Sequence, residues 1–261
     1  MNPIPHLLLQ SDATSPTADQ LKEAFRGVKG WTAVDAAKIA RQADGILMRG
    51  LSMEDATSVQ QRLRGQGVST EVWPEAQVAV LPEPKHTRRF ELQPDALVVY
   101  DAIGRPVPVP WANVALLAAG IMPRVNIVSF TTEEVEISTD LDGWTKRDVV
   151  TRLSHKLDTN AQLVLDIILT GGGMRFQVES REFLYKYVVD RPDLDAHQRL
   201  GEAVRLLIER APQVLLNRGA RQLRDKLPLP LLYSSKAMFT DESAWILWRA
   251  GRPAQGATPG P

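Results

Sequence analysis

The chain has 261 residues, 44% of them hydrophobic and 24% charged, which supplies a sizeable core and favours two domains. Lys plus Arg and Asp plus Glu number 31 each, so the formal net charge is zero and no bulk field attracts polyphosphate or anionic lipid. The absence of cysteine excludes disulfides, thiolate nucleophiles and cysteine-bound metals.

No targeting or membrane segment is predicted. The N-terminal stretch lacks the basic region of a signal peptide, and its apolar run at 7–9 is short. The most apolar internal stretch, 114–122, falls far below the ~20 residues that span a bilayer. No Asn-x-Ser/Thr sequon occurs. We therefore expect a soluble, cytoplasmic protein without a membrane span.

The first part of the chain, 1–73, is predicted to form a small module of the order β-α-α-β-α-β. Apolar or alternating runs predict strands at 4–10, 45–51 and 68–73. The intervening helices begin at capping residues that have Gln or Asp three positions later, namely Thr17, Thr32 and Ser52.

Two phrases in this module, LKEAFRGVKGWTAVDAAKIA and GLSMEDATSVQQRLRGQGVSTEV, resemble a known fold. They are similar to the C-terminal domain of the ribosomal stalk protein and to the ClpS protease adaptor, over residues 4–73. The resemblance implies a bacterial docking module that binds other proteins.

The binding residues of those families carry over poorly. The stalk family uses a basic surface on its first two helices, where this chain keeps Arg26 but has Glu23 and Val34 in place of lysines. The ClpS family uses an Asn-Asp-Asp-like start and a helix histidine, whereas this chain has Gln-Ser-Asp at 10–12 and no histidine in its second helix. The resemblance therefore implies the shape without either binding chemistry.

The candidate partner surface on this module consists of Arg26, Lys29 and Trp31. Trp31 falls at the turn between the two helices, where a large aromatic side chain is unusual. It is interpreted either as a plug between two domains or as an anchor for a partner protein.

Residues 74–87 carry three prolines and are predicted to be a linker or an edge-strand approach to the next domain. A second domain is expected over 88–218. Its predicted strands are 88–93, 96–101, 107–109, 114–120, 125–130 and 133–138, followed by a hairpin of 164–169 and 174–179 around the glycines at 171–173. Residues 139–159 are predicted to be a polar connection, and 196–210 an amphipathic helix.

The phrase LVVYDAIGRPVPVPWANVALL is similar to the bacterial branch of the pleckstrin-homology-like superfamily. That resemblance implies an antiparallel β-barrel-like domain closed by a C-terminal helix, so the expected fold class is α+β. The turn within the phrase carries only one basic residue, Arg105, and lipid binding is not implied.

The C-terminal part is predicted to be an extension over 219–250 with a disordered tail at 251–261. It begins with a basic helix and ends with a short helix at 241–248 that carries Trp245 and Trp248. This pair is interpreted as packing back on the barrel or as anchoring a partner or a second subunit.

No catalytic residue, metal site or cofactor is predicted. The glycines at 171–173 precede a strand-like segment, which favours a hairpin turn over a phosphate loop. The Asp-Leu-Asp-Gly at 140–143 starts like a calcium loop, but its twelfth position is Thr151 rather than Glu. None of the four histidines is spaced for a metal.

The sequence favours a non-catalytic, adaptor-like protein that binds another protein, and it leaves homo-oligomers open. One alternative is an enzyme whose dispersed site lies in an inter-domain cleft with Asp101, Arg105 and Arg175. Another is nucleic-acid binding, which the near-neutral pI of about 6.9 disfavours. Its candidate residues are Arg88, Arg89, Arg221 and Arg224.

Overall fold

The computed structural model describes residues 4–11, 15–26, 28–42, 45–78, 80–139, 145–227 and 233–251, and over 124–160 the backbone alone. Within these residues the protein is α+β, with six α-helices and eleven strands in three sheets. Its contacts divide the chain into two units, one of which is Pro123–Gln162 and the other the remainder.

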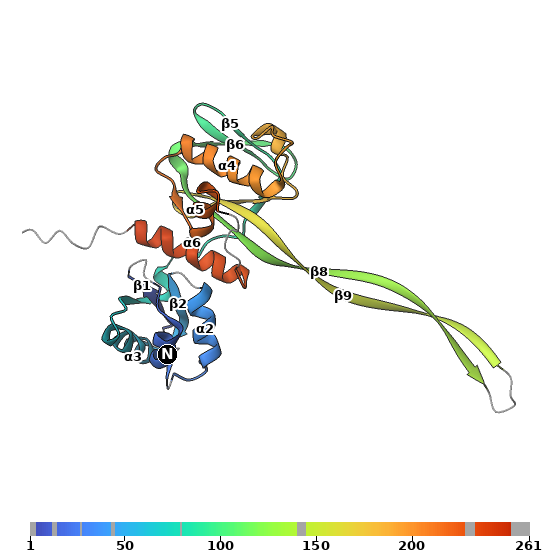
Figure 1. Cartoon of the computed structure of the whole chain (residues 1–261), viewed down its shortest axis with the longest axis horizontal. Coiled ribbons are helices and arrows are strands. Elements are labelled where there is room, and N and C mark those ends of the chain that lie inside the picture. Colours follow the sequence, from blue (N-terminus) through green and yellow to red (C-terminus); the bar gives the residue numbers. More distant parts are fainter. Residues whose placement is uncertain are drawn as a thin grey trace, which may run out of the picture. The chain divides into compact units, whose positions relative to one another are not determined.

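The first module has the predicted β-α-α-β-α-β order (Figure 1). Its elements are β1 (His6–Gln10), α1 (Ala18–Phe25), α2 (Ala33–Gln42), β2 (Ile46–Leu51), α3 (Met53–Gly65) and β3 (Thr70–Pro74). β1 lies between β2 and β3 and is antiparallel to both. The caps at Thr17 and Ser52 are confirmed, because each side-chain oxygen accepts a hydrogen bond from the backbone N–H three residues later.

β1 is buried on both of its faces. Leu8 packs in the core formed with the three helices, whereas Leu7 and Leu9 belong to a separate cluster with residues of the C-terminal helix. This division follows from the alternation of side chains along a strand. The module's sheet therefore has a second apolar face that another element must cover.

The rest of this unit holds the other two sheets. Its elements are β4 (Lys85–Thr87), β5 (Phe90–Leu92), β6 (Ala96–Tyr100), β7 (Pro106–Pro110), β8 (Val114–Thr139), β9 (Thr145–Leu169), β10 (Arg175–Glu179), α4 (Ala196–Arg210), β11 (Leu215–Leu216), α5 (Arg218–Arg224) and α6 (Lys236–Ala250). Short 3-10 turns occur at Glu75–Gln77, Trp111–Asn113 and Tyr185–Tyr187. β8 and β9 continue beyond this unit into the second one.

The two sheets have the orders β11-β8-β9-β10-β4 and β5-β6-β7. Neither closes on itself among the described strands, so the expected barrel is not confirmed. The larger sheet is also not purely antiparallel, because β4 pairs with β10 and β11 with β8 in parallel. The helix expected at 196–210 is confirmed as α4, whose Leu200, Val204 and Leu207 pack in the core of this domain.

The hairpin expected around the glycines at 171–173 is confirmed. β9 and β10 pair antiparallel, and the turn places Gly171 and Gly172 at φ values of 80° and 66°. These are left-handed conformations that a Cβ atom disfavours. The glycines thus serve the turn, as predicted.

The polar connection predicted at 139–159 is wrong for the described residues, because β8 and β9 continue through it as strands of 26 and 25 residues. The strands expected at 125–130 and 133–138 are one uninterrupted strand. Threonine and valine recur throughout both segments, and these residues favour strands even where charges interrupt them. The loop proposed to resemble a calcium site, 140–143, lies outside the described residues.

The C-terminal helix α6 is longer than the predicted 241–248 and lies between two cores (Figure 1). Trp245 packs with Leu7 and Leu9 of the first module, whereas Phe239 packs with Leu116 and Ile168 of the larger sheet. α6 therefore joins the two sheets. No helix in the described ranges is both long and apolar enough to cross a membrane.

Candidate docking surfaces

Trp245 is an internal anchor of α6. Its side chain is buried, and its Nε1–H donates a 2.9 Å hydrogen bond to the carbonyl of Gln10. Gly45 lies under the indole with a φ of 93°, and a Cβ there would come within 2.2 Å of the Trp245 Cγ. Trp248 is half-buried and meets Trp73 edge-on at 5.5 Å between ring centroids. The predicted tryptophan pair therefore packs on the first module rather than on the second domain.

Arg49 of β2 reinforces this junction. Its Nη1 pairs with Glu75 at 2.9 Å, and its Nε donates to Asp241 of α6 at 3.1 Å. The hydrogen bonds with Asp241 raise the pKa of the Arg49 guanidinium further. The first module is thus tied to α6 by packing and by charge.

The three residues of the predicted partner surface have different surroundings. Trp31 is half-buried, meets Phe25 edge-on at 5.4 Å, and lines a hollow of 290 Å³ whose other walls come from α2, β2 and α6. Arg26 is exposed and pairs with Glu23 at 3.4 Å, and Lys29 is exposed in the following turn. Trp31 therefore lies at the junction with α6.

The arginines of the nucleic-acid alternative each bond within the chain. Arg89 pairs with Glu91 and stacks on the rings of Tyr100 and Tyr187, at 4.0 and 3.8 Å from their centroids. The other three bond as follows: Arg88 to the carbonyl of Glu182, Arg221 to that of Asn217, and Arg224 to Asp225. These contacts stabilise the fold. Each of the four arginines is thus already engaged with a group of its own chain.

The residues of the enzyme alternative serve two separate structures. Asp101 accepts hydrogen bonds from the backbone N–H of Ile103 and of Arg105, and it pairs with the Arg105 side chain at 2.8 Å. These bonds, led by the one from the Arg105 backbone, lower the pKa of Asp101. Asp101 therefore stabilises the turn that contains it. Arg175 lies instead in the buried core.

An open pocket of 650 Å³ adjoins that turn. It is lined by Asp101, Ile103, Arg105, Val107, Met174 and Phe176 together with residues of β4. Arg175 does not line it, so the three residues do not converge on one site. Within the described ranges, no three His, Asp or Glu side chains are grouped to hold a metal.

Arg175 belongs to a buried ionic cluster that the sequence did not reveal. It pairs with Asp166 of β9, whose other oxygen accepts a 2.7 Å hydrogen bond from Gln177. Its Nη1 also donates to Thr240 of α6 at 3.3 Å. Burial raises the pKa of Asp166. The cluster ties α6 to the sheet. In the sequence, the one sign of this cluster is that polar residues recur within otherwise apolar strands.

A second buried network surrounds Asn217. Its Oδ1 caps α5 through the N–H of Ala220 and accepts from the N–H of Ala119, while its Nδ2 donates to the Ala119 carbonyl. The same Nδ2 donates to Tyr233 Oη, which in turn donates to Glu242 of α6. α6 is thus held to the second domain by two polar networks as well as by packing.

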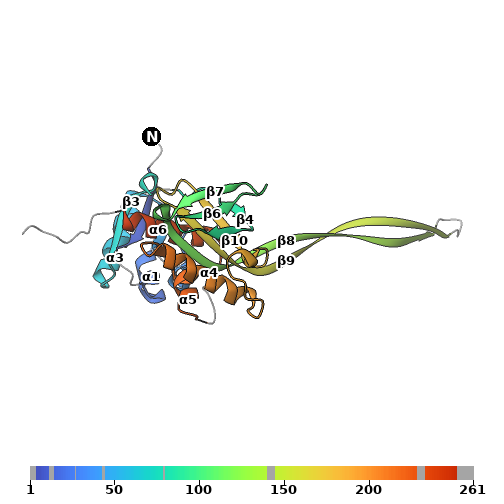
Figure 2. The same cartoon turned by 90° about the horizontal axis from the view of Figure 1, so that it is seen from above.

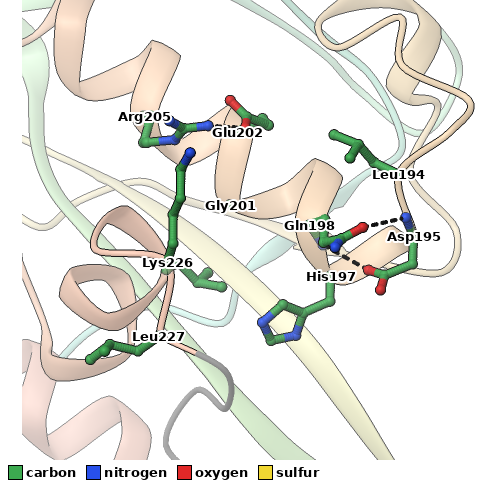
Figure 3. Close-up of a pocket in the computed structure, with 10 residues that line it drawn as sticks. Leu194, Asp195, His197, Gln198, Gly201, Glu202, Arg205, Lys226 and Leu227 are labelled. Atoms are coloured by element: carbon green, nitrogen blue, oxygen red, sulfur yellow. Dashed lines mark hydrogen bonds and ion pairs between the residues drawn. The ribbon is translucent and has the colours of Figure 1, made fainter.

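A hollow of 550 Å³ lies between α4 and the end of α5 (Figure 3). The Lys226 side chain extends across it toward Glu202 and Arg205, which pair with each other, and His197 borders it from α4. Its walls carry both signs of charge, from Asp195, Glu202, Arg205 and Lys226.

Lys226 ends α5 in a left-handed conformation, at a φ of 57°. Its N–H bonds to the carbonyl of Leu223, and the next N–H, of Leu227, bonds to that of Gln222. This pattern usually has glycine at the position of Lys226. We expect Lys226→Gly to raise the free energy of unfolding by about 0.5–1 kcal/mol in urea titrations. Lys226→Ala, which keeps the Cβ, should not raise the free energy of unfolding in this way. An equal rise in Lys226→Ala would show that the stabilisation comes from removing the charge.

The arm, defined as Pro123–Gln162, contains residues 123–139 of β8 and 145–162 of β9, which run side by side (Figures 1 and 2). The described pairings of the flanking strands fall outside it: β11 pairs with Leu116 and Leu117, and β10 with 164–168. Over the described residues of the arm, β8 and β9 thus have only each other as sheet neighbours. Each therefore presents one unpaired edge, a template for another strand.

Comparison with protein-family models, with curated proteins and with solved structures gave no match.

Proposed function

We propose that this chain is a non-catalytic interaction protein of the cytoplasm, and that its arm binds another protein chain by strand addition. The observation that carries the proposal is the pair of long strands whose outer edges have no neighbour in the sheet along the arm. The resemblance of the first module to docking domains supports the interaction role. The absence of cysteine is compatible with a reducing compartment such as the cytoplasm.

A third strand stabilises a two-stranded ribbon. An isolated hairpin is at best marginally stable in water, and three or more strands are needed for independent stability. An added strand supplies main-chain hydrogen bonds to one row of N–H and C=O groups, which gives affinity without a preformed pocket. The length of the arm offers many such bonds on either side.

The composition of the arm favours a protein partner over nucleic acid. Residues 123–162 contain five Lys or Arg and seven Asp or Glu, so the arm is net negative. A phosphate backbone would be repelled by such a segment, whereas strand pairing uses the backbone and tolerates both signs of charge.

The proposal is tested by photo-crosslinking in cells followed by binding with purified components. A benzophenone amino acid is placed at Thr132 in β8 or Thr151 in β9, with Asp95, an exposed turn residue outside the arm, as the control site. We expect one protein to be captured from both arm positions and not from Asp95.

The captured protein is then purified and titrated against the full chain and against a shortened chain in which Asn-Gly joins Met122 to Leu163. We expect the shortened chain to unfold cooperatively and to bind at least about 100-fold more weakly, because strand addition supplies the affinity. Equal binding by the two chains, or equal capture from Asp95, would refute a role of the arm.

A further inference from the structure

We infer that the arm's partner is a second copy of this chain, and that β8 of one copy pairs edge to edge with β9 of the next. This inference rests on the proposed function, because it names the chain that the arm binds. It is drawn from the distribution of charge over the two strands together with their unpaired edges.

The two strands of the arm carry opposite charge. Within the arm, β8 contains Glu133, Glu134 and Glu136 and one basic residue, Arg124. The arm's part of β9, 145–162, contains four basic residues and two acids, Asp148 and Asp158. The basic residues are Lys146, Arg147, Arg152 and Lys156. One edge of the arm is thus formed by an acidic strand and the other by a basic strand.

Two arms can meet edge to edge in three ways: β8 with β8, β9 with β9, or β8 with β9. Like charges on directly opposed strands destabilise a sheet, and opposite charges stabilise it. The first two pairings place acid against acid or base against base. Pairing β8 with β9 continues the alternation of an acidic strand and a basic strand that each ribbon already contains. Each strand within such a sheet then lies between two strands of opposite charge.

The favoured pairing has a consequence for symmetry. A two-fold axis relating two arms within one sheet always places a strand beside its own copy, so it generates only the first two pairings. Pairing β8 with β9 is heterologous: each added copy leaves one β8 edge and one β9 edge open. We therefore expect assemblies that grow beyond a dimer, as rings or as filaments.

The first experiment measures the mass of the full chain by light scattering across a wide concentration range. We expect the mass to rise past that of a dimer and to stay at one copy for the shortened chain. It should fall as salt is added, because opposite charges on the paired strands add to their main-chain hydrogen bonds. A full chain that remains a monomer at all concentrations overturns the inference. It leaves the proposed function standing if a different protein is captured by the arm.

The second experiment uses a charge-swapped chain that keeps its own ribbon complementary. It combines Glu133→Lys, Glu134→Lys and Glu136→Lys with Lys146→Glu, Arg147→Glu and Arg152→Glu. The swapped chain is expected to assemble with itself as the original chain does. A half-swapped chain, with only Glu133→Lys, Glu134→Lys and Glu136→Lys, has two basic strands. It is expected to stay at one copy, because every edge-to-edge pairing of two such arms opposes like charges.

Cysteine crosslinking separates the possible pairings, because the original chain has no cysteine. Thr132→Cys in β8 and Thr151→Cys in β9 are made as separate variants and treated, alone and mixed, with a short thiol crosslinker. We expect crosslinks mainly between the two variants. Crosslinks confined to each variant would show that β8 pairs with β8 or β9 with β9, and would overturn the inference. Assembly of the half-swapped chain equal to that of the original would show that assembly ignores the charges of the arm, and would overturn it as well.

Discussion

Replacing Trp245 with alanine is expected to lower the free energy of unfolding by about 3–5 kcal/mol, the usual cost of removing a large buried aromatic side chain. The indole fills the space between α6 and β1, where it packs on Leu7 and Leu9 and its N–H satisfies the Gln10 carbonyl. Alanine leaves a cavity there and an unsatisfied buried acceptor. Urea unfolding followed by circular dichroism measures the loss.

Trp248→Ala is the matched control, because Trp248 lies one helical turn later and is only half-buried. Its edge contact with Trp73 predicts a cost of about 1–2 kcal/mol. Equal losses for the two variants would contradict the role of Trp245 as the anchor of α6.

The contact with Gly45 allows a second check by a double-mutant cycle. Gly45→Ala should be severely destabilising alone, because the new Cβ meets the Trp245 ring. It should cost less in the Trp245→Ala background, where the ring is gone and only the strain of the positive φ remains.

The second large effect is expected for Arg175→Met, which should lower the free energy of unfolding by about 3–5 kcal/mol. Arg175 is 2% exposed and Asp166 fully buried, so the substitution leaves a carboxylate in the core with only Gln177 as a side-chain partner. The double variant Asp166→Leu/Arg175→Met should be much more stable than the single one, because a hydrophobic pair needs no desolvated charge. A double variant as unstable as the single one would contradict this explanation.

The loss in Arg175→Met should also depend on pH. Burial raises the pKa of Asp166, and the Arg175 charge opposes that rise, so removing it raises the pKa further. A carboxyl with a higher pKa in the folded state favours folding below its unfolded value of about 3.9, and this advantage is lost as the pH rises through the folded value. Relative to the original chain, the variant's deficit should be smaller at mildly acidic than at neutral pH. Urea titrations at both pH values measure the difference.

Much of the local structure was predictable from the sequence. The β-α-α-β-α-β order of the first module, the caps at Thr17 and Ser52, the glycine hairpin and α4 all follow from signals within a few residues. Capping, turn conformation and apolar periodicity are short-range effects, and a side chain's neighbours in sequence determine them. The apolar run at 4–10 likewise predicted the strand β1, but not its burial on both faces.

The tertiary structure alone decided what covers that strand and which polar residues are buried. Nothing near Trp245 in sequence indicates that it packs on β1, and nothing near Asp166 indicates its pairing with Arg175 across the β9–β10 hairpin. Strands were predicted at 125–130 and 133–138, but 139–159 was predicted to be a polar connection because its charged residues suggest a loop. The pairing of β8 with β9 instead makes the described residues of the arm a ribbon. Such contacts join segments far apart in the chain, and their stability depends on the surface that folding buries rather than on local propensity.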